Sequence, residues 1–235
     1  MNVLKIVIYL FFASGFSQIK NGRIEYSLVI DSFEGLKNSK STYYKSNYNK
    51  AIENAKYLNF ILEFNNESSA FYLEQGLGLD DGGYFYAKIH SGYMGKVFQN
   101  LDFTYALVNN EIGKFLLKRE TTKDWELINE TKNINGFLCY KAVGEFVINN
   151  GVGVFHHPVI AWYCPKIPNS FGPNGFGKLP GLILELQVKN ILFGVRKVEL
   201  NLDKPYLSEK NENVKTIDES EINKLIDKID RTSKN

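Results

Sequence analysis

This chain of 235 residues has almost no excess charge and few residues of the types that build catalytic or metal sites. It contains 28 lysines and arginines, 26 aspartates and glutamates, three histidines and two cysteines, and its formal net charge is +2. A near-neutral balance lacks the electrostatic footprint of a protein that binds nucleic acid or an anionic membrane surface. The composition therefore argues against a nucleic-acid partner.

Catalytic and metal-binding signatures are also missing from the sequence. There is no HExxH or CxxC spacing and no GxSxG elbow. His156 and His157 are adjacent, so on a strand they point to opposite faces and cannot easily clasp one ion together; His90 stands apart from both. The run Asp80-Asp81-Gly82-Gly83 lacks the alternate acidic residues of a calcium loop and is typical of a tight turn. We predict no metal, no cofactor and no catalytic residue.

A short apolar run occupies the N-terminus. Lys5 is followed by apolar residues from Ile6 to Ala13 and by the small residues Gly15 and Ser17, the plan of a secretory signal peptide. The run is about half the roughly 20 residues that a membrane span needs, so a retained anchor is the lesser alternative. We predict a signal peptide at residues 1–17. The remaining residues, 18–235, are expected to form a single exported β-rich domain in the periplasm or at the cell surface, near a membrane without spanning it.

Alternation of apolar and polar residues is the main structural pattern of the mature chain. Positions 24, 26, 28 and 30 are apolar and 23, 25 and 27 are polar, which predicts a strand with one wet face. Further short runs, separated by glycine, asparagine and aspartate, indicate consecutive antiparallel hairpins. They lie at 58–65, 69–74, 84–90, 96–101, 104–110, 114–120, 124–131, 136–148, 180–190 and 193–202.

Two segments depart from this alternation. Residues 36–56 predict either a short helix from about Tyr48 to Lys56 or a mobile excursion. Near the C-terminus, Thr216 and Glu219 match a capping box and apolar residues recur at helical spacing, which predicts a helix from about Asp218 to Asp230. The predicted fold is mainly β: one large curved antiparallel sheet or half-barrel, with a C-terminal helix and one short helix.

The two cysteines, Cys139 and Cys164, flank a hairpin signal at Asn150-Gly151. With a two-residue turn there, Cys139 faces Trp162; with a loop two residues longer, it faces Cys164. In both registers the cysteines share a face, so a cross-strand disulfide is available in an oxidising compartment. Two separately buried thiols are the open alternative. A nucleophilic cysteine is disfavoured, since neither has an acid-base partner nearby in the sequence.

The stretch from 171 to 190 combines a loop rich in glycine and proline with an aliphatic run. Proline fixes the backbone, so this loop holds one shape, and it leads into alternating apolar residues that predict an interior strand. Its aromatic and proline residues either form a binding groove or plug the end of the sheet. The candidate binding residues are Trp162, Tyr163, Phe171, Pro173, Phe176, Leu179, Pro180 and Gly181.

The segment from Trp125 to Leu186 resembles the GLPGLI family of secreted Bacteroidetes proteins. The resemblance is carried by the runs at 130–136 (ETKNING), 139–142 (CYKA), 161–163 (AWY), 167–168 (IP), 172–173 (GP) and 179–184 (LPGLIL). It implies a signal peptide and a β-rich body, and it implies no activity, because the family has none assigned. Lys178 departs from the family's first glycine. Cys164 stands where members tend to have threonine or serine, so the resemblance does not support the disulfide.

Many aromatic residues without a catalytic constellation favour a non-enzymatic binding protein of the cell envelope. Its apolar concavity, or the loop around Trp162 and Phe176, would contact a lipid, a peptide or an outer-membrane protein. One alternative is a hydrolase with a dispersed site, which requires a carboxylate coupled to a histidine in a cleft. Another is a structural subunit that adds strands to the sheet edge of another protein.

Overall fold

A computed structural model of the protein describes most of residues 18–235. The described residues are 19–32, 35, 40–75, 82–110, 113–121, 124–149, 153–203, 210, 213–222 and 224. The predicted signal peptide lies outside them, as does most of the predicted C-terminal helix. No helix within these ranges combines the length and the apolar composition needed to cross a lipid bilayer.

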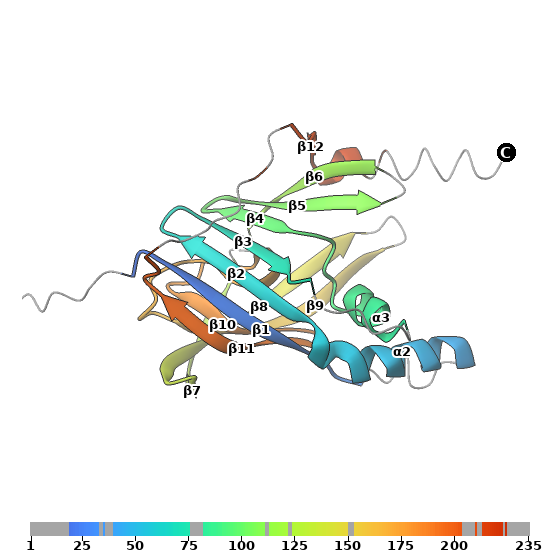
Figure 1. The fold of residues 1–235 in the computed structure, drawn as a ribbon, viewed down its shortest axis with the longest axis horizontal. Helices are drawn as coiled ribbons and strands as arrows, with labels where there is room; N and C mark the ends of the chain where they lie inside the picture. The colour runs from blue at the N-terminus through green and yellow to red at the C-terminus, as the bar shows by residue number, and fades with distance from the viewer. Residues whose placement is uncertain are drawn as a thin grey trace, which may run out of the picture.

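The described residues contain twelve strands, the helices α2 and α3, two short 3₁₀ turns and the start of a C-terminal helix (Figure 1). In chain order the elements are β1 (Asn21–Ile30), α2 (Thr42–Asn54), η1 (Ala55–Tyr57), β2 (Asn59–Asn65), β3 (Ser68–Leu73), α3 (Gly83–His90), β4 (Val97–Asn100), β5 (Phe103–Asn110), β6 (Gly113–Glu120), β7 (Glu126–Ile134), β8 (Phe137–Asn149), β9 (Val154–Cys164), η2 (Pro173–Gly175), β10 (Leu182–Val188), β11 (Ile191–Leu200) and β12 (Thr216–Ile217).

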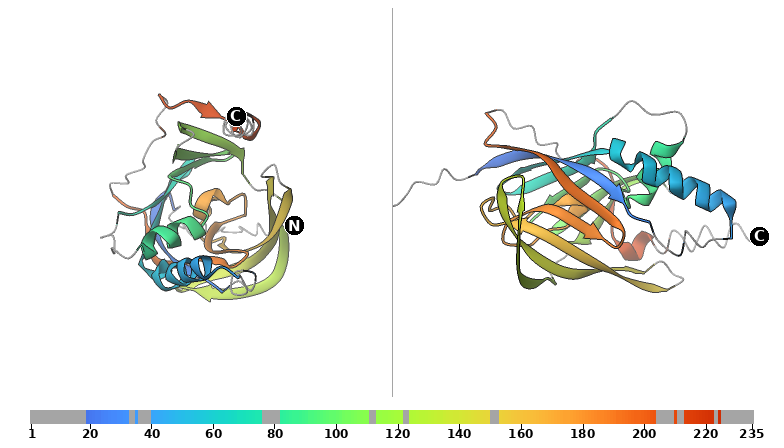
Figure 2. Two further views of the ribbon diagram at one scale, coloured as in Figure 1. Left: turned by 90° about the vertical axis from the view of Figure 1, so that its right-hand side faces the viewer. Right: turned by 90° about the horizontal axis from the view of Figure 1, so that it is seen from below.

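All twelve strands belong to one sheet in the order β12-β6-β5-β4-β3-β2-β1-β11-β10-β9-β8-β7. Every pairing is antiparallel except that of the two-residue β12 with β6. The strand after the proline loop, β10, lies between antiparallel β9 and β11. The sheet curls until β6 and β8 face each other across a cleft, and it stays open there (Figure 2). The predicted curved, mainly antiparallel sheet is confirmed.

Side chains on the concave face of the sheet form the main core. In β1 the alternating residues Ile24, Tyr26, Leu28 and Ile30 are at most 2% exposed, as their spacing predicted. Aromatic rings from distant strands meet beside them: Phe60 stacks on Phe71 at 5.3 Å between ring centroids and meets Phe193 edge-on at 5.2 Å. The core therefore joins both halves of the sheet.

Hairpin turns set the registers of the strands. Asn135 and Gly136 both adopt positive φ, 49° and 82°, between the paired residues Ile134 and Phe137, which is the two-residue turn that such a dipeptide favours. The turn between β8 and β9 is longer, because Asn149 pairs with Val154. Of the two registers that the sequence allowed for this hairpin, the protein therefore has the one with the longer loop.

The predicted strand at 84–90 is wrong, because this segment is helix α3. Gly83 and Ala87 are one helical turn apart and buried, while Phe85 and Ile89 are exposed. The two small residues let α3 pack closely against α2. Helix α2 begins at Thr42, six residues before the predicted start, because the side chain of Ser41 caps it by accepting from Tyr44 N–H at 3.4 Å.

The C-terminal helix also begins with a different cap from the predicted one. Residues 219–222 and 224 are helical. The Asp218 carboxylate accepts from the N–H of Glu221 at 2.9 Å, and the Glu221 side chain accepts from Asp218 N–H at 3.4 Å. The capping box is therefore Asp218 with Glu221, since Thr216 is in β12. The partly buried Ile222 packs against Phe115, Leu117 and Ile217 at the sheet edge.

Candidate functional site

The loop between β9 and β10, residues 165–181, lies inside the curve of the sheet. Phe171 and Phe176 are 1% and 5% exposed. Hydrogen bonds tie this loop to the surrounding sheet: Trp125 Nε1–H donates to Gly177 O at 2.9 Å, and Asn169 Nδ2–H donates to Asn65 O at 3.0 Å. The loop is thus a plug in the concavity, the second of the two roles that its composition allowed.

The eight candidate binding residues are mostly part of this plug. Those that are buried are Tyr163, Phe171, Pro173, Phe176, Leu179 and Gly181, whereas Trp162 is half-buried and Pro180 is exposed. Phe176 also lines the cavity described next. A binding role for these residues stays a prediction, and their burial restricts it to Trp162, Pro180 and Phe176.

A cavity of about 480 Å³ remains beside the plug, at the end of the sheet where α2 and α3 lie. Its walls come from strands on both sides of the concavity, from η2, from the turn between β10 and β11, and from the residues that follow α3. The apolar lining residues are Met94, Val97, Ala106, Phe146, Phe176, Val188, Ile191 and Phe193. The concavity is therefore filled at one end and hollow at the other.

Polar side chains line part of this cavity, and most of them already have protein partners. Arg119 Nε lies 2.8 Å from a carboxylate oxygen of Glu219, and Asn190 Nδ2–H donates to Tyr48 Oη at 3.0 Å. The His90 ring lies edge-on to Tyr48 at 5.1 Å, and burial lowers the pKa of this imidazole. His157 faces the cavity from β9. A ligand would therefore meet an apolar interior with a few fixed polar groups.

A second, more polar cleft of about 620 Å³ separates β6 from β8. Charged residues from both strands, from the segment before β7 and from the start of the C-terminal helix line it, among them Lys118, Asp124, Glu145 and Asp218. It shares Arg119, Glu120 and Phe146 with the apolar cavity. The opening of the sheet therefore continues from a polar cleft into an apolar cavity.

The adjacent imidazoles of β9 lie on opposite faces, as predicted, because His157 lines the cavity and His156 does not. His156 Nδ1 lies 2.8 Å from a carboxylate oxygen of Glu145, and both side chains are more than half exposed. Within the part of the chain that the structure describes, no three His, Cys, Asp or Glu side chains gather closely enough to hold a metal ion.

Cys139 and Cys164 face each other, because the register of β8 and β9 pairs Tyr140 with Tyr163 and continues one step to the cysteines. Both are fully buried free thiols joined by a hydrogen bond. That bond and burial raise the pKa of the Cys139 thiol. The pKa of Cys164 is lowered, first by the same bond and then by the N–H groups of Ile167 and Lys166. The disulfide stays a prediction, and the facing geometry that it requires is present.

Sequence reasoning expected an apolar concavity but did not identify the residues that line the cavity, because no local pattern marks an empty space. Val97 and Ala106 are partners in the hairpin of β4 and β5, but the sequence does not place Phe146 of β8 or Phe193 of β11 beside that hairpin. The available signal was Ala106, a small residue between larger ones on a strand. A small inward side chain leaves room that its neighbours do not fill.

Comparison with known proteins gives a family match over part of the chain. A family described as "Protein of unknown function (Porph_ging)" matches residues 147–185, which include β9, the plug and the start of β10. No curated protein matches. Among solved structures, "Structure of PNGF-II in P21 space group" is similar over 88% of this chain, with 16% identity and a TM-score of 0.52. The same protein in the C2 space group gives the same identity, coverage of this chain and TM-score.

The chain spans about a third of the length of the PNGF-II chains, 33% and 32%. At this identity the likeness concerns the fold alone. It agrees with the curved β-sheet, and it leaves the chemistry to be argued from the cavity and the surface of this chain.

Proposed function

We propose that this chain is an exported, non-enzymatic binding protein of the cell envelope that holds an apolar ligand in the cavity beside its plug. We also propose that it is a member of the GLPGLI family. The matched segment 147–185 includes residues 179–184, which carry much of that resemblance. The single observation that supports the binding function is the cavity of about 480 Å³ with an apolar lining.

The size and lining of the cavity suit a small ligand. Ligand pockets commonly have volumes of about 300–1,000 Å³ and mostly hydrophobic walls with a few fixed polar groups. Here Phe146, Phe176 and Phe193 supply apolar surface, while His157 and Asn190 supply polar contacts. The plug favours this function, because it fixes one wall and leaves the cavity pre-formed.

The contacts of the imidazoles favour binding over the hydrolase alternative. Acid-base catalysis needs a carboxylate coupled to an imidazole inside the cleft. Within the described residues the carboxylate that pairs with an imidazole is Glu145, which lines the polar cleft. Its partner His156 is 56% exposed and lines neither the cleft nor the cavity.

One observation supports the structural-subunit alternative and another argues against it. Strand β7 is the last strand of the sheet, so one of its edges is unpaired within the described residues. Its side chains are mostly exposed, with Glu126, Glu130 and Lys132 among them, and its pairing with β8 is irregular between Ile128 and Thr131. Charges and bulges are features that protect an edge against pairing, so the cavity has the stronger support.

Titration of residues 18–235 with the fluorescent probe anilinonaphthalene sulfonate, whose aromatic rings bind apolar surface, tests the cavity. Ala106→Phe adds a ring to the cavity wall and should weaken probe binding at least about tenfold. Leu107→Phe is the matched control, because the next residue of β5 points to the opposite face of the sheet. Its probe affinity should equal that of the unmodified protein.

Equal probe affinity in the unmodified protein and Ala106→Phe, with both folded by circular dichroism, would contradict the proposal. A second test uses protein purified natively from its envelope, extracted with organic solvent and analysed by mass spectrometry. A co-purifying apolar molecule is expected in the unmodified protein, and it should be depleted in Ala106→Phe. Equal amounts in both variants would show that the molecule binds elsewhere.

A further inference from the structure

Exposed apolar side chains gather at the end of the molecule that contains the cavity. We call this the cavity end; it is the right-hand side of Figure 1 and faces the viewer in the left panel of Figure 2. On α2 and α3 the exposed apolar residues are Tyr43, Tyr44, Phe85 and Ile89, and Met94 follows α3. Across the cavity, the tip of the β8–β9 hairpin exposes Val147, Val154 and Phe155.

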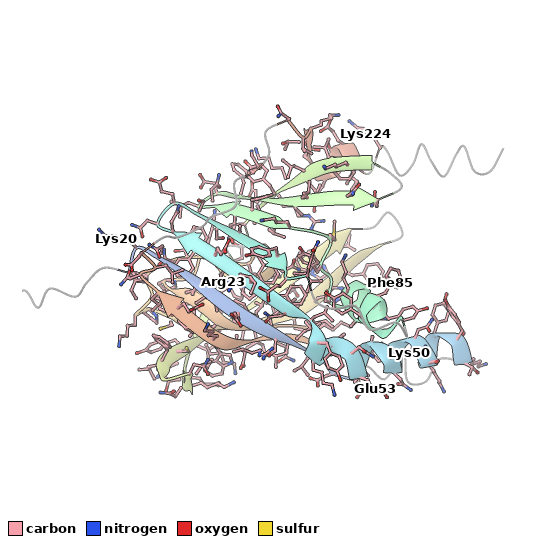
Figure 3. The ribbon with its side chains drawn as sticks, viewed as in Figure 1. Lys20, Arg23, Lys50, Glu53, Phe85 and Lys224 are labelled. Atoms are coloured by element: carbon pink, nitrogen blue, oxygen red, sulfur yellow. The ribbon has the colours of Figure 1, made fainter. Side chains whose placement is uncertain are left out.

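The helices at the cavity end are also positively charged. Residues 40–57 and 83–90 carry five lysines and one carboxylate, Glu53. Figure 3 labels Phe85, Lys50 and Glu53 on these two helices. The lysines are Lys40, Lys45, Lys50, Lys56 and Lys88. A net charge of +2 over the whole chain therefore conceals a basic region, which the composition alone did not reveal.

From these observations we propose that the cavity end docks on the surface of an anionic lipid bilayer. Aromatic and aliphatic side chains beside lysines are the composition of proteins that lie at a membrane interface. Tyrosine suits that position, because its ring is apolar and its hydroxyl stays hydrated. Each lysine near an anionic surface strengthens binding by about fivefold.

The arrangement fits a lipid surface better than a protein partner. The apolar side chains lie on two separate elements on either side of the cavity, α2 with α3 and the β8–β9 tip. A protein interface of standard size needs one complementary patch of about 800 Å² on each partner. A bilayer adapts to both elements at once. It would also let an apolar ligand pass between the membrane and the cavity without crossing water.

One side of α3 packs against α2 and the core, and the opposite side of α3 is exposed. Tyr43 Oη and Tyr86 Oη lie 3.4 Å apart between α2 and α3, and Gly83 and Ala87 are buried. Phe85 and Ile89 then lie on the exposed side of α3, 59% and 55% exposed. Two large apolar residues one turn apart on an exposed helical face have no role in the core, and a membrane surface gives them one.

Sedimentation of the mature chain with lipid vesicles tests this proposal. Binding is expected with vesicles of equal parts phosphatidylcholine and phosphatidylglycerol, and much weaker binding with phosphatidylcholine alone. The double variant Phe85→Ser/Ile89→Ser should weaken binding at least about tenfold, because each apolar side chain contributes through the surface it buries. Added salt should weaken binding to the anionic vesicles.

The matched control is the double variant Leu127→Ser/Leu138→Ser. Leu127 and Leu138 are 56% and 52% exposed, close to the 59% and 55% of Phe85 and Ile89, and Leu138 is at the opposite end of β8 from the hairpin tip. This control should bind vesicles as the unmodified protein does. Thermal unfolding of both doubles should match that of the unmodified protein, since all four side chains are exposed.

Absence of vesicle binding, or an equal loss in both double variants, would overturn the proposal. A third outcome would also overturn it: the protein binds envelope proteins but not vesicles, and Phe85→Ser/Ile89→Ser loses the binding to envelope proteins. The surface would then serve a protein partner. The result is separable from the cavity function. Phe85→Ser/Ile89→Ser should keep full probe affinity, and Ala106→Phe should keep full vesicle binding.

Discussion

The hydroxyl of Tyr26 donates a hydrogen bond of 2.6 Å to the backbone carbonyl of Ile183. The two residues are 157 positions apart, and the bond joins β1 to the start of β10 inside the core. It forms where the pairing of β9 and β10 is irregular, between Ile183 and Glu185. Ile183 N–H donates to Phe171 O at 3.0 Å. Both backbone groups of Ile183 are therefore satisfied by residues outside the neighbouring strands, one of them in the plug.

Replacement of Tyr26 by phenylalanine should destabilise the protein by about 1–3 kcal/mol, because it leaves a buried carbonyl without a donor. Burial raises the pKa of Tyr26 far above its ordinary value, so the hydroxyl remains a donor throughout the accessible pH range. Urea unfolding at neutral pH measures the effect. The control is Tyr57→Phe, whose side chain is exposed. Equal midpoints for the two variants would show that the bond contributes nothing.

Replacement of Gly181 by alanine should prevent folding or cost more than about 3 kcal/mol. The added Cβ would lie 2.3 Å from the carbonyl oxygen of Cys164, and the φ of Gly181 is +156°. Gly194→Ala is the matched control, because a Cβ there meets nothing within 4 Å. It should be neutral or stabilise the strand by about 0.5–1 kcal/mol. Soluble yield and urea midpoints distinguish the variants, and a stable Gly181→Ala protein would contradict the close approach.

Replacement of Lys178 by glycine should stabilise the protein by about 0.5–1 kcal/mol. The substitution removes the strain of a left-handed backbone conformation, and part of that gain is offset by the greater flexibility of glycine in the unfolded chain. Lys178 has a φ of 62°, at the position where the GLPGLI hexapeptide has glycine. Its N–H donates to Ser170 O at 2.9 Å, and glycine keeps that bond. Lys178→Ala should give no gain, since alanine bears the same strain. A gain of equal size in both variants would assign the effect to the lysine side chain instead.

Local patterns predicted most strands, because burial of one sheet face imposes a period of two on the sequence. The residues of β1 from Ile24 to Ile30 show this, and so does the antiparallel setting of β10. The segment 84–90 was wrongly predicted as a strand, because seven residues that are mostly apolar fit the period of a helix as well as that of a strand. What distinguishes them is the burial of Gly83 and Ala87, one helical turn apart, and the packing of α3 against α2, a partner some 35 residues away.

The candidate site was less accessible to sequence reasoning than the fold. Glycine, proline and aromatic residues correctly marked 171–181 as a loop, and they left open whether it is a groove or a plug. Its inward position depends on Trp125 and Asn65, which donate and accept hydrogen bonds from other parts of the sheet. The facing of Cys139 and Cys164 was one of two registers, because Asn150-Gly151 does not fix the length of its loop.

Protein exported to an oxidising compartment should contain a disulfide between Cys139 and Cys164. The two thiols lose their hydrogens to a thiol–disulfide oxidoreductase or to oxygen, and the sulfur atoms then bond. Unfolding without reductant and alkylation should label neither cysteine, whereas prior reduction should allow both to be labelled. Closing a loop of about 26 residues should add roughly 3 kcal/mol, so reduction should lower the urea midpoint. Full labelling without reductant would show that the buried pair remains reduced.

Acidification should destabilise the folded protein through His90. Burial lowers the pKa of this imidazole in the folded state below its ordinary value near 6.5, so below that pH the unfolded state binds the proton more tightly. Stability therefore falls as the pH drops from about 6.5 toward the folded-state pKa, and it is fully present at higher pH. Urea midpoints of the unmodified protein and of His90→Gln measure this contribution when they are compared at about pH 7.5 and about pH 5.5, on either side of the ordinary histidine pKa of about 6.5. The decline should be smaller in His90→Gln, because glutamine does not titrate there. An identical decline in both proteins would mean that burial of His90 does not contribute to the pH dependence of stability.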